Sequence, residues 1–71
     1  MVEMVFVQSS NIDAVGYDAT LGELHVRFKQ SLATYVYQGV PPDVHERMMQ
    51  SASKGQFHAR EVKDLYPFYR G

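Results

Sequence analysis

Residues 23–29 alternate strictly between apolar and charged or titratable side chains, and no other feature of the chain constrains the fold as strongly. Leu24, Val26 and Phe28 have one parity, so in a β-strand they point to one face and the residues between them point to the other. A helix would spread these three side chains around its circumference. The pattern therefore predicts a strand in a sheet that buries one of its faces.

A second strand is predicted directly after this one. Residues 32–38 are rich in β-branched and aromatic side chains, and only a short connection separates them from the first strand. The two segments should pair as an antiparallel hairpin. Upstream, residues 12–18 are predicted to form another strand, in which Gly16 marks a bulge or a close backbone approach. Residues 4–7 are expected to form either a short strand or a leading arm.

Helix signals replace strand signals after Gly39. Proline suits the first turn of a helix because its missing N–H needs no partner there, so Pro41 and Pro42 predict a helix over about residues 41–51. The apolar stripe of this helix is predicted to consist of Val44, Met48 and Ala52, with Val40 packed ahead of them.

A second helix is predicted to follow at once. Ser53 and Gln56 have the spacing of a capping box, in which each side chain satisfies an exposed backbone N–H. Pro67 disfavours helical geometry at Tyr66, so the helix should end there. Its buried side is predicted to contain Phe57, Val62, Leu65 and Tyr66. Together the elements predict an α+β fold, a three- to four-stranded antiparallel β-meander followed by two α-helices packed on one face, in a single domain over residues 1–71.

Several functional classes are not expected from this composition. The chain has no cysteine, hence no disulfide, no thiolate nucleophile and no cysteine-bearing zinc site. The three histidines lack metal-ligand spacing, and Ser9 and Ser10 have neither a nucleophile elbow nor an identifiable base, so we expect no metal, no cofactor and no enzymatic activity. The apolar run at the N-terminus is too short for a signal peptide or a membrane span, so a cytoplasmic protein without membrane contact is expected.

The charges are nearly balanced but unevenly distributed. Seven basic and eight acidic side chains give a net charge of −1, and the acidic excess lies in residues 1–50. Residues 51–71 hold four basic and two acidic side chains. This is far from the concentrated basic stripe of a strong nucleic-acid binder, so any phosphate binding should be weak and sensitive to salt.

Several short motifs, in their order and spacing, resemble the KTSC family over about residues 8–68. They are Ser9-Ser10-x-Ile12, Val15-Gly16-Tyr17-Asp18, Leu24-x-Val26-x-Phe28, Tyr35-x-Tyr37, Val40-Pro41, Ser53-x-Gly55 and Tyr66-Pro67. That family is a small domain found at the C-terminus of some lysyl-tRNA synthetases and as a stand-alone bacterial protein. The resemblance implies a binding module without established activity and, through the synthetase attachment, an RNA-binding role. The family pattern places an aromatic residue and then Asn after the position of Phe57, where this chain has His58 and Ala59.

Two tyrosines on one predicted strand form a candidate nucleic-acid site. Tyr35 and Tyr37 have the same parity, so their rings share a face, as on sheets where single-stranded bases stack on aromatic side chains. The candidate phosphate contacts are Arg27, Lys29, Lys54, Arg60 and Lys63. The alternative is that both rings pack under the helices as ordinary core, where they could not stack bases. The orientation of the two tyrosines separates these interpretations.

A protein-interaction or self-association module is the alternative function. Phe6 near the N-terminus and Phe68 and Tyr69 near the C-terminus, together with Met4, would form an apolar patch if the tail after Pro67 does not fold back. An N-terminal strand edge could also pair with a second chain. A protein partner or a homodimer would require no excess of charge.

Overall fold

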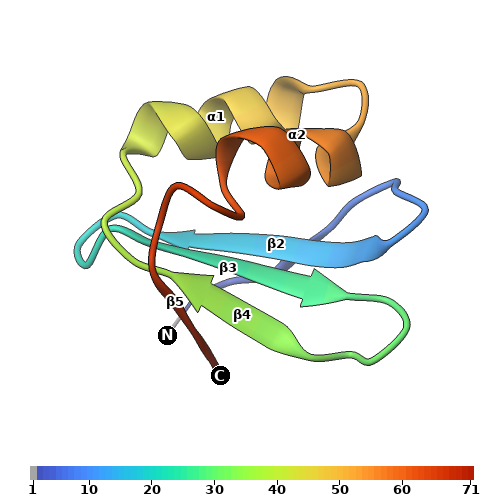
Figure 1. Ribbon diagram of the computed structural model, residues 1–71, viewed down its shortest axis with the longest axis horizontal. Coiled ribbons are helices and arrows are strands. Elements are labelled where there is room, and N and C mark those ends of the chain that lie inside the picture. Colours follow the sequence, from blue (N-terminus) through green and yellow to red (C-terminus); the bar gives the residue numbers. More distant parts are fainter. Residues whose placement is uncertain (1) are drawn as a thin grey trace.

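The computed structural model describes residues 2–71 and contains a five-stranded antiparallel sheet with two helices on one side of it (Figure 1). The elements, in chain order, are β1 (Val5–Phe6), β2 (Ile12–Asp18), β3 (Glu23–Phe28), β4 (Thr34–Tyr37), α1 (Pro42–Gln50), α2 (Lys54–Glu61) and β5 (Phe68–Arg70). The predicted α+β class, the antiparallel meander and the helices that follow it are confirmed. The sheet has five strands where three to four were predicted, because the chain returns after α2 and adds β5 beside β4.

The register of the central strands separates two faces of the sheet. Leu24 lies opposite Tyr37 and Val26 lies opposite Tyr35, so these four side chains point to the same side. Leu24, Val26 and Tyr37 belong to a buried cluster with Val44 and Met48 of α1, which identifies this side as the one the helices cover. We call it the helix face and the opposite side the open face.

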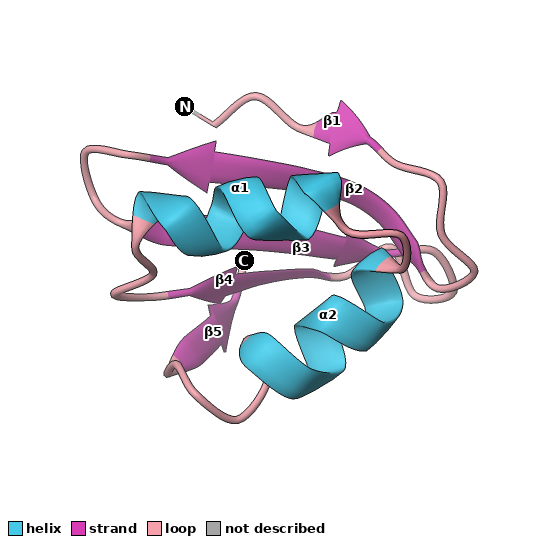
Figure 2. Cartoon of the chain, turned by 90° about the horizontal axis from the view of Figure 1, so that it is seen from above, coloured by secondary structure: helices cyan, strands magenta, loops and turns pink. Residues whose placement is uncertain are grey.

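The first helix forms close to its predicted position and covers one side of the core. Val44 and Met48 are buried and Val40 packs ahead of them, as predicted, whereas Ala52 is exposed because α1 ends at Gln50. Seen from above, α1 lies over β2 and β3, and α2 lies nearer to β4 and β5 (Figure 2).

The second helix starts as predicted but ends early. Ser53 caps it, its Oγ accepting the backbone N–H of Gln56 at 3.3 Å, which confirms the predicted helix start and the serine half of the capping box. The helix was predicted to reach Tyr66 and instead ends at Glu61, where the backbone N–H groups of Val62 and Lys63 both donate to the His58 carbonyl. The turn that follows leaves Leu65 62% exposed, so its predicted place in the core is wrong.

The N-terminal segment crosses the open face and explains a glycine in β2. A Cβ atom at Gly16 would lie 2.8 Å from Met4 Sδ and 2.9 Å from the Glu3 carbonyl oxygen, closer than real Cβ atoms approach other atoms. The predicted close backbone approach at Gly16 is therefore confirmed. Within residues 2–71, no helix is long and apolar enough to cross a membrane.

Candidate functional site

Four aromatic side chains from three neighbouring strands meet on the helix face beside α2. They are Phe28 of β3, Tyr35 and Tyr37 of β4, and Phe68 of β5. Tyr35 stacks on Phe68 with ring centroids 5.2 Å apart and ring planes 7° apart, and Phe28 meets Tyr35 edge-on at 5.5 Å. These positions share one parity, so the strand alternation itself assembles the cluster.

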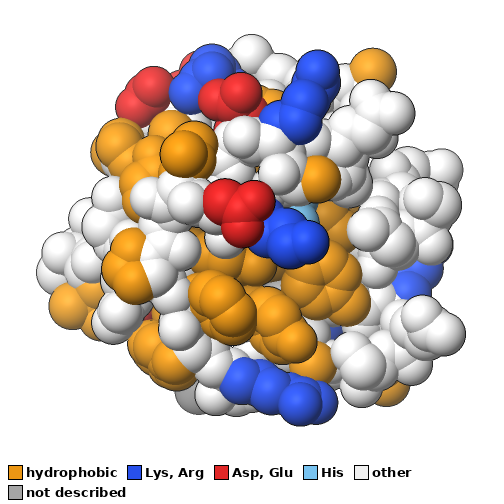
Figure 3. All heavy atoms as spheres, viewed as in Figure 1, with side chains coloured by type: hydrophobic (Ala, Val, Ile, Leu, Met, Phe, Trp, Pro, Cys, Tyr) orange, Lys and Arg blue, Asp and Glu red, His pale blue; other side chains and the backbone are white. Residues whose placement is uncertain are grey.

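These side chains line a groove of about 440 Å³ between the strands and α2, which we call the aromatic groove. Its other walls are Asn11, Ser31, Gly55, His58, Ala59, Lys63 and Asp64. Figure 3 shows apolar side chains gathered on this side of the molecule, with basic and acidic side chains beside them. The groove thus combines ring surfaces with a few polar groups, as ligand sites commonly do.

A second hollow of about 630 Å³ adjoins the aromatic groove, and we call it the polar extension. The two share Asn11, Phe28 and Ser31, and the extension adds Lys29 among its lining residues. Asn11 is held at this junction because its Oδ1 accepts the Ser9 hydroxyl at 3.1 Å. Groove and extension together form a trough with a ring surface in one half and hydrogen-bonding groups in the other.

His58 and Tyr37 form a buried polar pair at the bottom of the aromatic groove. Tyr37 Oη and His58 Nε2 lie 2.6 Å apart. Burial, with smaller contributions from Tyr35 and Asp64, raises the pKa of Tyr37 to about 12. Burial, and then the nearby Lys63 ammonium, lowers the pKa of His58. Both side chains are therefore uncharged at neutral pH.

The two tyrosines lie on the covered face, and only one of them is partly accessible. Tyr37 is 1% exposed beneath α2, so its ring has no free surface for a base. Tyr35 is partly buried and is stacked on Phe68. The most exposed ring of the groove is Phe68, which is 52% exposed.

The structure brings together only part of the predicted basic set. Lys63 lines the aromatic groove and Lys29 lines the polar extension. Arg27 has the opposite parity and lies on the open face, where its Nε donates to Asp13 Oδ2 at 2.9 Å. Lys54 donates to the Ser51 carbonyl oxygen at 2.9 Å, and the exposed Arg60 lines neither hollow.

The proposed interface residues are also divided between two places. Phe6 lies on β1 and Phe68 and Tyr69 lie on β5, and these strands are the two opposite edges of the sheet. The tail folds back as a strand, so the condition for one combined patch is not met. Because Phe68 and Tyr69 are neighbours in a strand, Phe68 faces the helix side and Tyr69 the open side.

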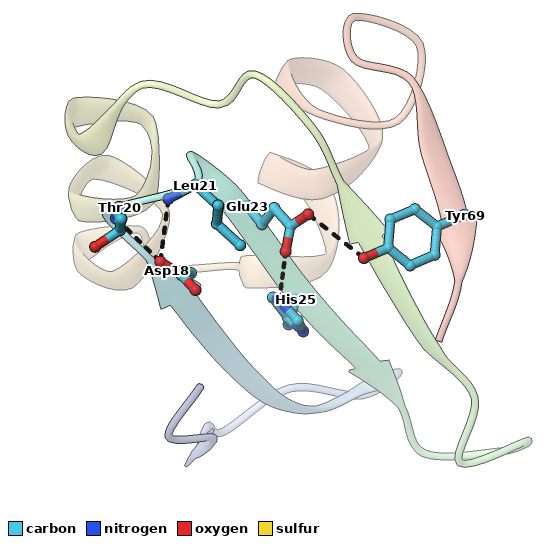
Figure 4. A network of polar contacts seen from close by, with 6 residues as sticks. All are labelled: Asp18, Thr20, Leu21, Glu23, His25 and Tyr69. Carbon is cyan, nitrogen blue, oxygen red and sulfur yellow. Dashed lines mark hydrogen bonds and ion pairs between the residues drawn. The ribbon is translucent and has the colours of Figure 1, made fainter. Parts of the chain in front are cut away.

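The open face carries an acidic network instead of an aromatic groove (Figure 4). The Tyr69 hydroxyl donates to Glu23 Oε2 at 3.4 Å, and His25 Nε2 lies 3.6 Å from Glu23 Oε1. Asp18 accepts the backbone N–H groups of Thr20 and Leu21 in the adjacent turn. This face has a shallow hollow of about 500 Å³ lined by both carboxylates and, among the described residues, by no lysine or arginine. Phosphates would be repelled here.

The sequence argument did not predict the buried role of His58, and it assigned Phe68 only to a protein interface and not to a nucleic-acid site. His58 lies four residues before Val62, so the helical period places both on the buried side of α2, and this spacing could have identified it. Phe68 has no such signal, because β5 is only three residues long and follows a proline. Its place was set by tertiary pairing with Tyr37 of β4.

The fold and the groove together define the class of protein. It is a small α+β domain in which two helices cover one face of the sheet and an open groove is lined by aromatic side chains. Within residues 2–71, no group of three or more His, Cys, Asp or Glu side chains could hold a metal ion. The model of the KTSC domain family matches residues 8–66, and the chain belongs to this family.

Related proteins agree with this assignment. A protein from Tsukamurella paurometabola is 43% identical over 60 residues, which cover 84% of this chain and 88% of that protein. An uncharacterised protein from Stutzerimonas stutzeri is 34% identical over 61 residues, which cover 86% of this chain and 83% of that protein. The crystal structure of a KTSC domain protein from Yersinia pestis matches with a TM-score of 0.95 and 31% identity, covering 100% of this chain and 99% of that one. The resemblance stated from the sequence is confirmed.

Proposed function

We propose that the domain is a non-enzymatic binding module that holds single-stranded nucleic acid, RNA in the first place, in the aromatic groove and its polar extension. The observation that carries the proposal is the placement of Lys63 and Lys29 along one trough whose shared wall is Phe28 and whose accessible ring is Phe68. Bases stack on aromatic rings whatever their sequence, and lysines beside the rings contact phosphates.

The expected binding is weak. Stacking of one base on an aromatic ring contributes about 1–3 kcal/mol. Two lysines neutralising two phosphates of a single strand would give a salt slope of about −1.4, since each contact contributes about −0.7. Asp64 also lines the groove and opposes additional phosphates. These terms favour a dissociation constant on the order of 10⁻⁴ M near physiological salt.

The test is a fluorescence anisotropy titration with a short labelled oligouridylate at low and at physiological salt. Phe68→Ala should weaken binding about tenfold, because it removes the stacking surface. Tyr69→Ala is the matched control, since it truncates the next ring of β5, which points to the open face. Circular dichroism verifies that each variant is folded. Absence of binding at low salt, or equal losses in both variants, would contradict the proposal.

Self-association through a sheet edge is the second candidate. Phe6 is 74% exposed on β1, a two-residue strand that pairs with β2 and forms one edge of the sheet. An exposed edge with a large apolar side chain is a template for pairing with a second chain. Sedimentation velocity over a range of concentrations tests it. A dimer weakened by Phe6→Glu would support this function, and a strict monomer at high concentration would exclude it.

A further inference from the structure

The hydroxyl of Tyr37 acts as the donor in its hydrogen bond with His58. Tyr37 is buried, and within residues 2–71 its Oη has no hydrogen-bond partner other than His58 Nε2. If Oη instead accepted a hydrogen bond from an Nε2–H group, the hydroxyl's own hydrogen would be left without an acceptor in the interior. An unsatisfied buried donor is costly, whereas donation to Nε2 satisfies both groups.

This arrangement places the proton of the neutral imidazole on the other ring nitrogen. A neutral histidine whose Nε2 accepts a hydrogen bond carries its hydrogen on Nδ1. The ring is also held in place by two edge-on aromatic contacts, to Phe28 at 5.2 Å and to Tyr37 at 5.3 Å between centroids. His58 is thereby restricted in tautomer and in orientation.

The Nδ1 hydrogen is available to a ligand. In residues 2–71, the only buried side-chain polar atom without a partner is His25 Nε2. His58 Nδ1 makes no hydrogen bond to these residues and is not among the buried unpartnered atoms, so it keeps some exposed surface, and the residue it belongs to lines the aromatic groove. The aromatic groove therefore contains a donor among its ring surfaces.

We propose that His58 presents the aromatic groove with a fixed, uncharged hydrogen-bond donor, and that the group bound there is a nucleobase, held through a carbonyl or ring-nitrogen acceptor on its edge. This inference rests on the proposed function and deepens it. A phosphate would select a cation, which the groove provides in Lys63. Within this trough, His58 would contact the base, Lys63 would contact the backbone, and Tyr37 would act as a positioning residue.

The first measurement is the tautomer of His58 in the free protein, read from long-range proton–nitrogen NMR spectra of the imidazole. The Nδ1–H form is expected near neutral pH. Predominance of the Nε2–H form would overturn the inference, whether or not any oligonucleotide binds.

The second measurement compares oligouridylate binding by Tyr37→Phe and by Tyr66→Phe. Tyr37→Phe removes the hydroxyl that fixes the tautomer, so affinity should fall about fivefold, roughly the value of one hydrogen bond. The salt slope should not change, because no phosphate contact is lost. Tyr66→Phe removes a hydroxyl from a residue that does not line the groove and should bind like the wild type. Unchanged affinity in Tyr37→Phe would overturn the inference.

A rescue variant covers the case in which Tyr37→Phe does not fold. His58→Gln offers an amide oxygen to Tyr37 and an amide N–H to the groove, so it should keep affinity within about twofold of the wild type. His58→Phe combined with Tyr37→Phe leaves no polar group stranded and should lose about fivefold. Equal affinities in these two variants would overturn the donor role. No binding by the wild type would overturn the proposed function, and with it a base as the partner of His58, even where the Nδ1–H tautomer is observed.

Discussion

The two faces of the sheet are built from the same strands yet differ in almost every property that governs binding. The helix face has a trough with Lys63 and Lys29 among its lining residues and an uncharged Tyr37–His58 pair at its base. The open face has a shallow hollow with Glu23 among its lining residues. Successive side chains of a strand point to opposite faces, so a few alternating positions suffice to create two surfaces of different chemistry.

This difference shows why residues close in sequence need not share a site. Arg27 precedes Phe28 by one position, yet Arg27 pairs with Asp13 on the open face and Phe28 lines the trough. Phe68 and Tyr69 are divided in the same way across β5. The function proposed for the domain belongs to one face, and the comparison can be tested by changing matched residues on each.

The largest expected effect is on stability. Met48 of α1 is fully buried on the helix face, so Met48→Ala should lower the free energy of unfolding by about 2–5 kcal/mol. A domain of this size has a total of roughly 3–5 kcal/mol, so this variant should lose a large part of its stability. Met4→Ala on the open face should cost only about 1 kcal/mol, because Met4 is only partly buried. Urea denaturation followed by circular dichroism measures both, and similar losses would contradict the comparison.

The next prediction concerns the dependence of the free energy of unfolding on pH. Burial lowers the pKa of both His58 and His45 below the ordinary value of 6.5. Below about pH 6.5 the unfolded chain therefore binds protons that the folded chain does not, so the free energy of unfolding should fall as the pH falls. The urea midpoint, measured between about pH 7.5 and 5, should decrease.

A double variant separates the contribution of His58, on the helix face, to the pH dependence of the urea midpoint. In the double variant Tyr37→Phe, His58→Phe, the contribution of His58 is absent and only that of His45 remains, so the midpoint should depend less on pH. A pH dependence equal to that of the wild type would mean that His58 is not held neutral in the folded chain.

The smallest expected effects come from substitutions of charged residues. Arg27→Gln on the open face removes a partly exposed ion pair with Asp13 and should cost at most about 1 kcal/mol of stability, with no change in oligouridylate affinity. Lys63→Gln should leave stability nearly unchanged and reduce the salt slope of binding by about 0.7. Anisotropy titrations at several salt concentrations measure the affinity and salt slope of both variants. A reduced slope in Arg27→Gln would show that phosphates bind on the open face and would contradict the comparison.

Local patterns were sufficient to predict most of the fold. The alternation around Leu24 and Val26 predicted the helix face, and Ser53 with Gln56 predicted the start of α2. These features depend on neighbours within one or two turns of the chain. The strand β5 was not predicted, because a three-residue strand has no period of its own and exists only through pairing with β4.

The candidate site was only partly predictable for the same reason. The shared face of Tyr35 and Tyr37 followed from strand parity, but which side the helices would cover is a tertiary property. Covering by α2 turned Tyr37 from a candidate stacking ring into a buried partner of His58. Phe68, brought in by β5, provides the accessible ring instead.

The most direct test of the two-face account is the set of intermolecular NOEs between oligouridylate and the side chains of the protein. Side-chain protons report the face on which they lie, which backbone amides of a sheet do not distinguish. The account predicts NOEs from base protons to the rings of Phe68, Tyr35 and His58. NOEs confined to Tyr69, Val36 and His25 would place the ligand on the open face and contradict it.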